Sequence, residues 1–307
     1  MTASRTALDA DRWHFQHGPI DIVIEAHGDA SAVGAAHAAA WQRFGGVLEE
    51  LVAELPALRQ PVSETAPRFE GPIAQRMATA CAPHSDHFIT SMAAVAGSVA
   101  DELIAFYDRP GIARAWVNNG GDIALHLAPG QSVRVGLFAD LARFDLRDAG
   151  RVTTDGQFDI GAELPVRGVA TSGWRGRSFS LGIADSVTVL AATASAADAA
   201  ATMVANAVDV VDAGILRRPA RECKDDSDLG DTPVTVDVAQ LSPAQVRRAL
   251  DAGEARAIAL QQRGLLWSAV LVCQGQWRMV EPLCSVGERA QRGVAADSES
   301  SVGSVFA

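Results

Sequence analysis

Hydrophobic and polar positions change their spacing several times along the chain, and each change predicts a different element. Residues 13–26 alternate after a His-Gly-Pro turn, which predicts two strands joined by a tight connection. From Ser31 to about Leu58 apolar residues recur every three or four positions, so we expect one amphipathic helix that Pro56 stops. Residues 59–83 show no regular spacing and are rich in proline, which indicates an irregular segment.

A second apolar stripe predicts a helix from about Thr90 to Tyr107, with small residues over much of its remaining surface. Next comes Arg114–Leu127, in which two asparagines and two glycines interrupt a strand pattern. Ser132–Phe138 alternates after a Pro-Gly turn, and we expect it to pair with that strand as a hairpin. The first half of the chain therefore follows the order strand, strand, helix, helix, strand, strand.

The second half repeats this order less clearly. Its expected elements, in chain order, are strands at Gly156–Ile160, Arg167–Ala170 and Ser186–Ala191, a helix from Ser195, a strand at Val234–Val238, a helix at Ser242–Ala252 and a hairpin at Leu265–Val280. We divide the chain into a flexible N-terminus (1–12), a first ββααββ half (13–140), a second half packed intimately against the first (141–285) and a disordered tail (286–307).

Composition narrows the choice of partners. A chain of 307 residues, of which 48% are hydrophobic, is long enough to bury a substantial core. Its net charge of −11, with no run rich in Lys or Arg, argues against nucleic acid or a membrane surface as partner. Lys224 is the only lysine, so a Schiff-base enzyme or a Walker-type phosphate loop has almost no candidate residue.

Cysteine usage and hydropathy indicate the compartment. The four cysteines form no Cys-x-x-Cys pair and no zinc-ligand spacing, which is typical of reduced thiols. No apolar run reaches the length of a membrane span. We therefore expect a soluble cytoplasmic protein.

The stretch Asn118-Asn119-Gly120-Gly121-Asp122 is the first candidate for chemistry. Asn and Gly tolerate positive backbone dihedrals, so amides of the first four residues can converge on a phosphate or a ring carbonyl, with Asp122 beside the ligand. A tight hairpin bend is the alternative, because Asn-Gly is its usual sequence.

The alanine-rich run near residue 200 holds a second candidate. Asp198, Thr202 and Asn206 are spaced by four and so share one face of the predicted helix. A carboxylate and a hydroxyl at that spacing suit a hard cation such as Mg²⁺, which prefers oxygen ligands. The alternative is structural, with Ser195 and Asp198 forming a capping box and Thr202 bonding back to a carbonyl.

A third candidate, Thr171-Ser172-Gly173, ends an expected strand. Its two hydroxyls and its glycine could reach a phosphate, although such triplets also form simple turns.

The order of these segments resembles the ApbE superfamily of FAD:protein FMN transferases, and the chain looks closest to a cytoplasmic UPF branch of it. The resemblance covers roughly residues 13–285 and rests on three motifs. Ala93–Asp101 is similar to the family's GIAKGYAVD helix, Asn118–Asp122 to its N-x-GGD turn, and Ala197–Thr202 to its ADALAT helix. Thr171–Gly173 falls where the family has its own TSG.

The resemblance implies a fold and a site. The expected class is α+β, with tandem T-fold-like halves in which antiparallel sheets carry helices on one side. By analogy with the transferases, Asp198 and Thr202 would hold Mg²⁺ together with a backbone carbonyl near Val95. The turn at 118–122 and the triplet at 171–173 would line a site for FAD or FMN.

Two departures separate this chain from the transferases. Ala96 stands where the family's GIAKG lysine is expected, and Ser178–Asp185 replaces a motif of the type His-Ile-Ile-Asp-Pro. The second change removes groups that would position and activate the hydroxyl accepting the transferred group. The second change therefore argues against protein flavinylation.

Three functional hypotheses follow. The leading one is a protein that binds a flavin or another small nucleotide-like ligand with Mg²⁺ between its halves, and that, if it is an enzyme, transfers a phosphoryl or nucleotidyl group. The second is an enzyme of pterin or purine-related metabolism in which Asp122, Glu102 or Asp101 grips the N–C–N edge of the ring. The third is a non-catalytic, homo-oligomeric nucleotide-binding protein.

Overall fold

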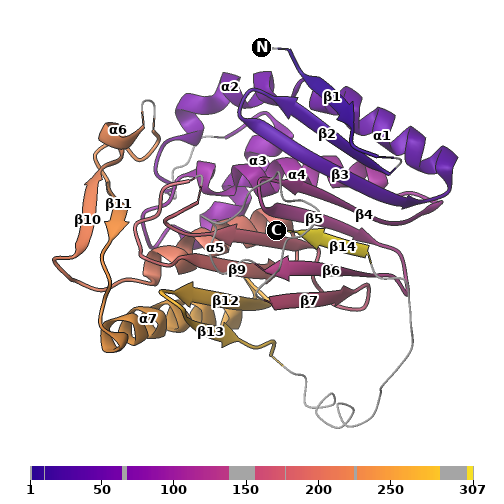
Figure 1. Ribbon diagram of the computed structural model, residues 1–307. Helices are drawn as coiled ribbons and strands as arrows, with labels where there is room; N and C mark the ends of the chain where they lie inside the picture. The colour runs from indigo at the N-terminus through magenta and orange to yellow at the C-terminus, as the bar shows by residue number, and fades with distance from the viewer. Residues whose placement is uncertain are drawn as a thin grey trace, which may run out of the picture.

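The computed structural model describes residues 2–9, 11–63, 68–137, 156–176, 178–224, 227–283 and 303–306. Within these ranges a nine-stranded antiparallel sheet forms the centre of the molecule (Figure 1). Its strands, from one edge to the other, are β1 (Ser4–Ala7), β2 (Arg12–His17), β3 (Ile20–Gly28), β4 (Ile112–Asn119), β5 (Asp122–Leu127), β8 (Gly168–Ser172), β9 (Ser186–Ala191), β12 (Ser268–Cys273) and β13 (Gln276–Val280).

Both halves of the chain contribute four consecutive strands to this sheet. Strands β2 to β5 lie side by side in chain order, and so do β8, β9, β12 and β13. The halves join where β5 pairs with β8, through Ile123 with Val169 and Ala124 with Gly168. In each half the helices are inserted between the second and third of the four strands. The α+β class with antiparallel strands is thus confirmed, whereas the division at residues 140 and 141 lies outside the described residues.

The helices pack on one face of the sheet. They are α1 (Ala30–Phe44), α2 (Val47–Leu58), α3 (Pro72–Cys81), α4 (Val95–Ile104), α5 (Ala194–Ala207) and α7 (Pro243–Gln262), with 3₁₀ turns at Ala82–His84, Ser91–Ala94 and Ala105–Tyr107. Alternation along β4 shows why, since Ala115 and Val117 pack with the helices of the first half while Trp116 points to the opposite face. The prediction that helices cover one side of the sheet is confirmed.

A small three-stranded sheet covers the centre of the other face. It consists of β14 (Gly303–Phe306), β6 (Ser132–Leu137) and β7 (Gly156–Gly161), in that order. The expected pairing of Ser132–Phe138 with Arg114–Leu127 is therefore wrong, because β6 pairs with β7. Val133 and Val135 instead bury their side chains against Trp116 and its neighbours, so burial of apolar surface determines where β6 lies. The rest of the tail at 286–307 lies outside the described residues.

The single helix expected from Ser31 to Leu58 is also wrong. The chain forms two helices that meet at Gly45 and Gly46, and glycine is the residue least able to sustain a helix apart from proline. Pro56 lies inside α2 and does not stop it, since Ala57 and Leu58 still belong to the helix.

The segment 59–83, expected to be irregular, contains α3. Its proline at position 72 is the first helical residue, where a missing N–H is tolerated. Glu54 and Glu50 of α2 accept hydrogen bonds from the N–H groups of Gly71 (2.8 Å) and Ile73 (3.4 Å) at the start of α3. The carboxylates thus satisfy free amides at a helix N-terminus, an interaction between helices that the local pattern does not show.

An arm projects from the body of the second half (Figure 1). It is formed by β10 (Ile215–Pro219), the short helix α6 (Ala220–Cys223), and β11 (Pro233–Val238), which pairs antiparallel with β10. Strand β11 and the hairpin β12–β13 confirm the sequence prediction, whereas β10 and α6 were not expected. No helix in the described part of the chain is long and apolar enough to cross a membrane.

Candidate functional site

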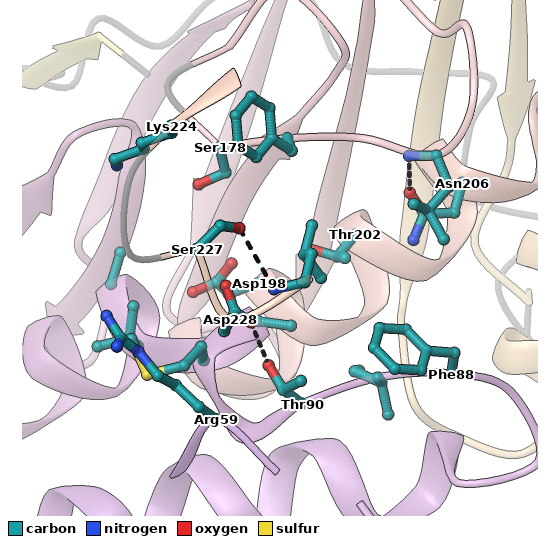
Figure 2. Close-up of a pocket in the computed structure, with 18 of the residues that line it drawn as sticks. Arg59, Phe88, Thr90, Ser178, Asp198, Thr202, Asn206, Lys224, Ser227 and Asp228 are labelled. Atoms are coloured by element: carbon teal, nitrogen blue, oxygen red, sulfur yellow. Dashed lines mark hydrogen bonds between the residues drawn. The ribbon is translucent and has the colours of Figure 1, made fainter. Parts of the chain in front are cut away.

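A cavity of about 280 Å³ lies between the two halves (Figure 2). The first half lines it from the end of α2, the segment before α4, the start of α4 and the start of β5. The second half lines it from segment 178–181, from α5 and from the tip of the arm. The lining residues that matter here are Arg59, Phe88, Thr90, Val95, Asp122, Ser178, Phe179, Asp198, Thr202, Asn206, Lys224, Ser227 and Asp228.

Asp198 and Thr202 lie on the cavity wall one helical turn apart on α5. The Asp198 carboxylate accepts a hydrogen bond of 3.0 Å from the N–H of Gly97 in α4. This contact needs close helices, since a Cβ on Gly97 would lie 2.3 Å from the carbonyl oxygen of Ala194. The glycine in the sequence motif is therefore explained by helix packing beside the cavity.

The structure does not contain the expected alternative, a capping box of Ser195 and Asp198 with Thr202 bonded back to a carbonyl. Helix α5 is capped by Thr193, whose hydroxyl accepts from the N–H of Ala196 at 3.2 Å. Asp101 adds two hydrogen bonds of 2.9 Å from the first amides of the helix. Asp198 takes no part in this cap, and no hydrogen bond joins the Thr202 hydroxyl to a carbonyl of the described residues. Both side chains are thus available to a ligand in the cavity.

Asp122 begins β5 and is only 9% exposed, on the wall that Asp198 also forms. Burial raises the pKa of Asp122 to about 7, although the N–H of Thr171 offsets part of this by donating a hydrogen bond of 3.3 Å. Burial also raises the pKa of Asp198 well above its ordinary value, and the negative charge of Asp122 adds to that shift. The two carboxylates therefore repel each other across a site with little solvent.

Among the described residues, no basic side chain forms an ion pair with the carboxylate of Asp122 or Asp198. The same residues contain no cluster of three or more His, Cys, Asp or Glu side chains arranged as a metal site. A cation here would instead use the Asp198 carboxylate, the Thr202 hydroxyl and the Val95 carbonyl, an all-oxygen set of the kind that Mg²⁺ prefers.

The stretch Asn118–Asp122 forms the hairpin between β4 and β5. Its turn consists of Gly120 and Gly121, with φ of 69° and 111°, and the Asn118 side chain accepts the N–H of Gly121 at 2.9 Å. Asn119 donates to the carbonyl of Ala96 at 3.1 Å and so ties the hairpin to α4. The hairpin alternative therefore describes the backbone, and within this stretch Asp122 is the residue that lines the cavity.

Thr171, Ser172 and Gly173 lie behind Asp122 and not on the cavity wall. Thr171 holds Asp122 through its N–H, and its hydroxyl contacts that of Thr188 at 2.9 Å. Gly173 packs so closely against the backbone of Asp185 that a Cβ would lie 2.4 Å from its carbonyl oxygen. In this structure the triplet positions Asp122.

Several cavity residues were not found from the sequence. Arg59, Phe88, Thr90 and Phe179 lie in loops or at helix ends, where no periodic pattern marks them. Lys224 had one available signal, its being the only lysine of the chain, which we used only to exclude enzyme classes. Asn206 was noted by its spacing, and it accepts the N–H of Leu181 (2.9 Å) and the Ser180 hydroxyl (3.2 Å), which shapes the 178–181 wall.

Of the three carboxylates considered for gripping a heterocycle, Asp122 alone lines the cavity. Glu102 forms ion pairs with Arg43 (2.7 Å) and Arg76 (3.0 Å), and Asp101 caps α5.

The sequence model of a family described as "AbpE bacteria" matches residues 4–279. A UPF0280 protein of Methanopyrus kandleri is 37% identical over 213 residues, which cover 67% of this chain and 78% of that protein. A UPF0280 protein of Methanosphaerula palustris is 35% identical over 162 residues, 52% of this chain and 63% of that protein. A third, of Methanospirillum hungatei, is 37% identical over 128 residues, so the chain spans only 48% of its length.

Two solved structures show a general likeness. One is the ApbE protein of Thermotoga maritima, with a TM-score of 0.41 and 11% identity, covering 90% of this chain and 96% of that one. The other is a mutant of the flavin transferase ApbE from Vibrio cholerae, with a TM-score of 0.37 and 12% identity, covering 91% and 97%.

Proposed function

Because the chain belongs to the family described as "AbpE bacteria", we propose that its cavity binds a flavin or a related nucleotide together with Mg²⁺. The observation that carries this proposal is the convergence of Asp122 and Asp198 on one cavity, where neither carboxylate has an ion-pair partner among the described residues. Two carboxylates forced together in a poorly solvated site bind a divalent cation favourably, since the cation removes their mutual repulsion.

The donor set fits magnesium. Asp198, Thr202 and the carbonyl of Val95 would hold the ion, and Asp122 would add charge beside it. When bound, Mg²⁺ would neutralise phosphate oxygens and polarise the bond to a transferred group. The protein's own part is to fix these ligands, which it does by docking α5 against Gly97 of α4.

The remaining wall suits a nucleotide. Phe88 and Phe179 offer aromatic faces to a planar ring, and Arg59 and Lys224 bring positive charge to an otherwise acidic site. A volume of about 280 Å³ is near the lower limit for small-molecule pockets, so a dinucleotide such as FAD would extend beyond it. The Asn118–Gly121 turn and the Thr171–Gly173 triplet would then support the ligand site through Asp122.

Transfer of a phosphoryl or nucleotidyl group is the reaction that this arrangement favours. Ser178 and Phe179 line the cavity within the segment that replaces the transferases' His-containing motif. Neither residue is a general base at neutral pH, so the acceptor would differ from that of the transferases. The pterin or purine alternative depends on Asp122, because an ionised carboxylate on the cavity wall can accept two N–H bonds from the N–C–N edge of a ring.

Cation binding is the direct test. Calorimetric titration of the purified protein with Mg²⁺ should show binding that Asp198→Asn weakens by at least about tenfold, since the substitution removes a charged ligand while keeping its shape. Asp251→Asn is the matched control, because Asp251 lies on α7 and pairs with Arg278 at 2.9 Å, away from the cavity. Equal Mg²⁺ affinity in Asp198→Asn and the control would remove the metal site from the proposal.

A further inference from the structure

The arm forms part of the cavity wall. Beyond α6 its tip contributes Lys224, Ser227 and Asp228 to the lining. The arm is fixed at its base, where the N–H of Thr235 donates to the carbonyl of Ser180 at 2.9 Å and Arg217 pairs with Asp209 at 2.5 Å.

At its tip the arm is fixed to the first half of the chain. The hydroxyl of Thr90, which is 2% exposed, donates a hydrogen bond of 2.6 Å to the Asp228 carboxylate (Figure 2). Within the tip, Arg221 pairs with Asp231 at 2.7 Å. The arm is thus attached to the second half at its base and to the first half at its tip, where Lys224 lines the cavity.

The ammonium group of Lys224 has no hydrogen-bond or ion-pair partner in the described part of the protein. No carboxylate of those residues lies within ion-pair distance of its ammonium group, although Asp122 and Asp198 line the same cavity. Two hydroxyl groups accompany it on the wall, those of Ser178 and Ser227. The Ser227 oxygen accepts the N–H of Leu229 at 3.2 Å, so its hydrogen remains available to an acceptor.

An aromatic ring, a carboxylate and an ammonium group line the same cavity, those of Phe88, Asp198 and Lys224. In Figure 2, Asp198 lies between Lys224 and Ser178 on one side and Phe88 on the other. A ligand that places its ring at Phe88 and one anionic group at the cation would turn a further anionic oxygen toward a wall that includes Lys224. The ammonium group and both hydroxyl groups can each donate a hydrogen bond to such an anionic oxygen.

We infer that Lys224 is a ligand-binding residue that the arm carries to the cavity, where it binds a phosphate-type anion of the bound molecule. This inference rests on the proposed function, because it places the ligand in the same cavity as the cation. The arm would then contribute to ligand specificity by favouring ligands that carry a phosphate-type group.

The first experiment compares FMN with riboflavin, which differ by one phosphate, in the presence of Mg²⁺. Binding is followed by flavin fluorescence. Lys224→Gln should weaken FMN binding by about tenfold, the usual size of a charge-assisted hydrogen bond at a partly exposed site, and should leave riboflavin binding unchanged. Lys224→Arg should restore most of the FMN affinity, because it keeps the charge and the donors.

Arg221→Gln is the matched control. It removes one positive charge from the same arm, but Arg221 is 64% exposed, pairs with Asp231 and does not line the cavity. Equal weakening of FMN binding in Arg221→Gln and Lys224→Gln would show a general charge effect and overturn the inference. Unchanged FMN affinity in Lys224→Gln, or no FMN binding by the unaltered protein, would also overturn it.

The second experiment measures how fast Lys224, the single lysine of the chain, is chemically modified. An amine-reactive ester should modify Lys224, and the intact mass and a peptide map report the rate. FMN or inorganic pyrophosphate with Mg²⁺ should slow this modification by about tenfold, while the α-amino group of the same chain reacts as before. No protection by either compound overturns the inference.

The two proposals fail in different ways. If Mg²⁺ does not bind, or binds independently of Asp198, the proposed function fails. If Mg²⁺ binds through Asp198 and both anions leave Lys224 unprotected, only the role of Lys224 fails.

Discussion

Asp122 is buried and Asp198 is half-buried on the same cavity wall, which is costly for two carboxylates. Asp198 follows from the sequence, since its spacing from Thr202 already places both on one face of a helix. Asp122 was predicted for a different reason, because the amides of the turn before it were expected to bind a ligand. That turn is a hairpin between β4 and β5. The carboxylate, and not the turn amides, reaches the cavity.

The pH dependence of stability provides a prediction at this scale. A carboxyl whose folded pKa exceeds its unfolded value binds more protons when folded, so stability falls as pH rises between the two values. For Asp122 that window runs from 3.8 to about 7, and Asp198 shifts in the same direction. Without Mg²⁺, the melting temperature should fall across this window, and Asp198→Asn should reduce the fall and raise stability near neutral pH by about 1 kcal/mol or more.

Magnesium should reduce the loss of stability that accompanies rising pH. Because Mg²⁺ binds the ionised carboxylates, its stabilising effect in thermal melts should be larger above the window than below it. Asp251→Asn should behave as the unaltered protein does, since its carboxylate is exposed and paired. A melting temperature that rises from mildly acidic to neutral pH without Mg²⁺, with Asp198→Asn showing the same rise, would contradict the coupling between these carboxylates.

Substitution of Gly97 tests whether close packing of α4 against α5 positions the site. Its Cβ would collide with the Ala194 carbonyl at 2.3 Å, so Gly97→Ala must separate α4 from α5 and should destabilise the protein by about 1–3 kcal/mol. Gly34→Ala is the control, because nothing lies within 4 Å of the position that its Cβ would take, and alanine favours the helix there by about 0.5–1 kcal/mol. Chemical denaturation measures both, and equal stability of the two variants would show that the helix contact is not tight.

At the scale of elements, most strands and helices could be predicted, and so could the hairpins β2–β3 and β12–β13, but the partner of β6 could not. Alternation identified β6 as a strand. Its expected partner, Arg114–Leu127, and its observed partner, β7, both have strand patterns, so the local sequence does not distinguish between them. The two glycines that divide α1 from α2 are visible in the sequence, yet the apolar spacing continues through them. Of the arm, β11 was predicted, whereas β10 and α6 were missed because they are too short to show a periodic pattern.

The attachment of the arm gives a prediction at this scale. Thr90→Val removes the hydroxyl that bonds to Asp228 while keeping the side chain's shape. Hydrogen exchange should become faster in β10, α6 and β11, and FMN affinity should fall by a few-fold because Lys224 is held less firmly. Thr79→Val is the control, since Thr79 is bonded only to its own helix at 2.8 Å, and unchanged exchange in the arm of Thr90→Val would contradict this role.

For the whole molecule, the cavity exists because two similar halves share one sheet. Pairing of β5 with β8 brings the first half's Asp122 to the second half's Asp198, and α4 packs against α5 directly behind them. Neither half holds the proposed cation site alone, since Val95 and Asp122 come from the first and Asp198 and Thr202 from the second. Motif spacing predicts each contribution, but only long-range packing shows that Arg59, Phe88 and Lys224 complete the wall.

The position of the bound metal tests this account most directly. Crystals grown with Mn²⁺ in place of Mg²⁺ and with FMN would locate the ion by its anomalous scattering. The account predicts a peak bounded by the Asp198 carboxylate, the Thr202 hydroxyl and the Val95 carbonyl, with Asp122 beside it. A well-ordered cavity without that peak, or manganese bound only elsewhere, would contradict it.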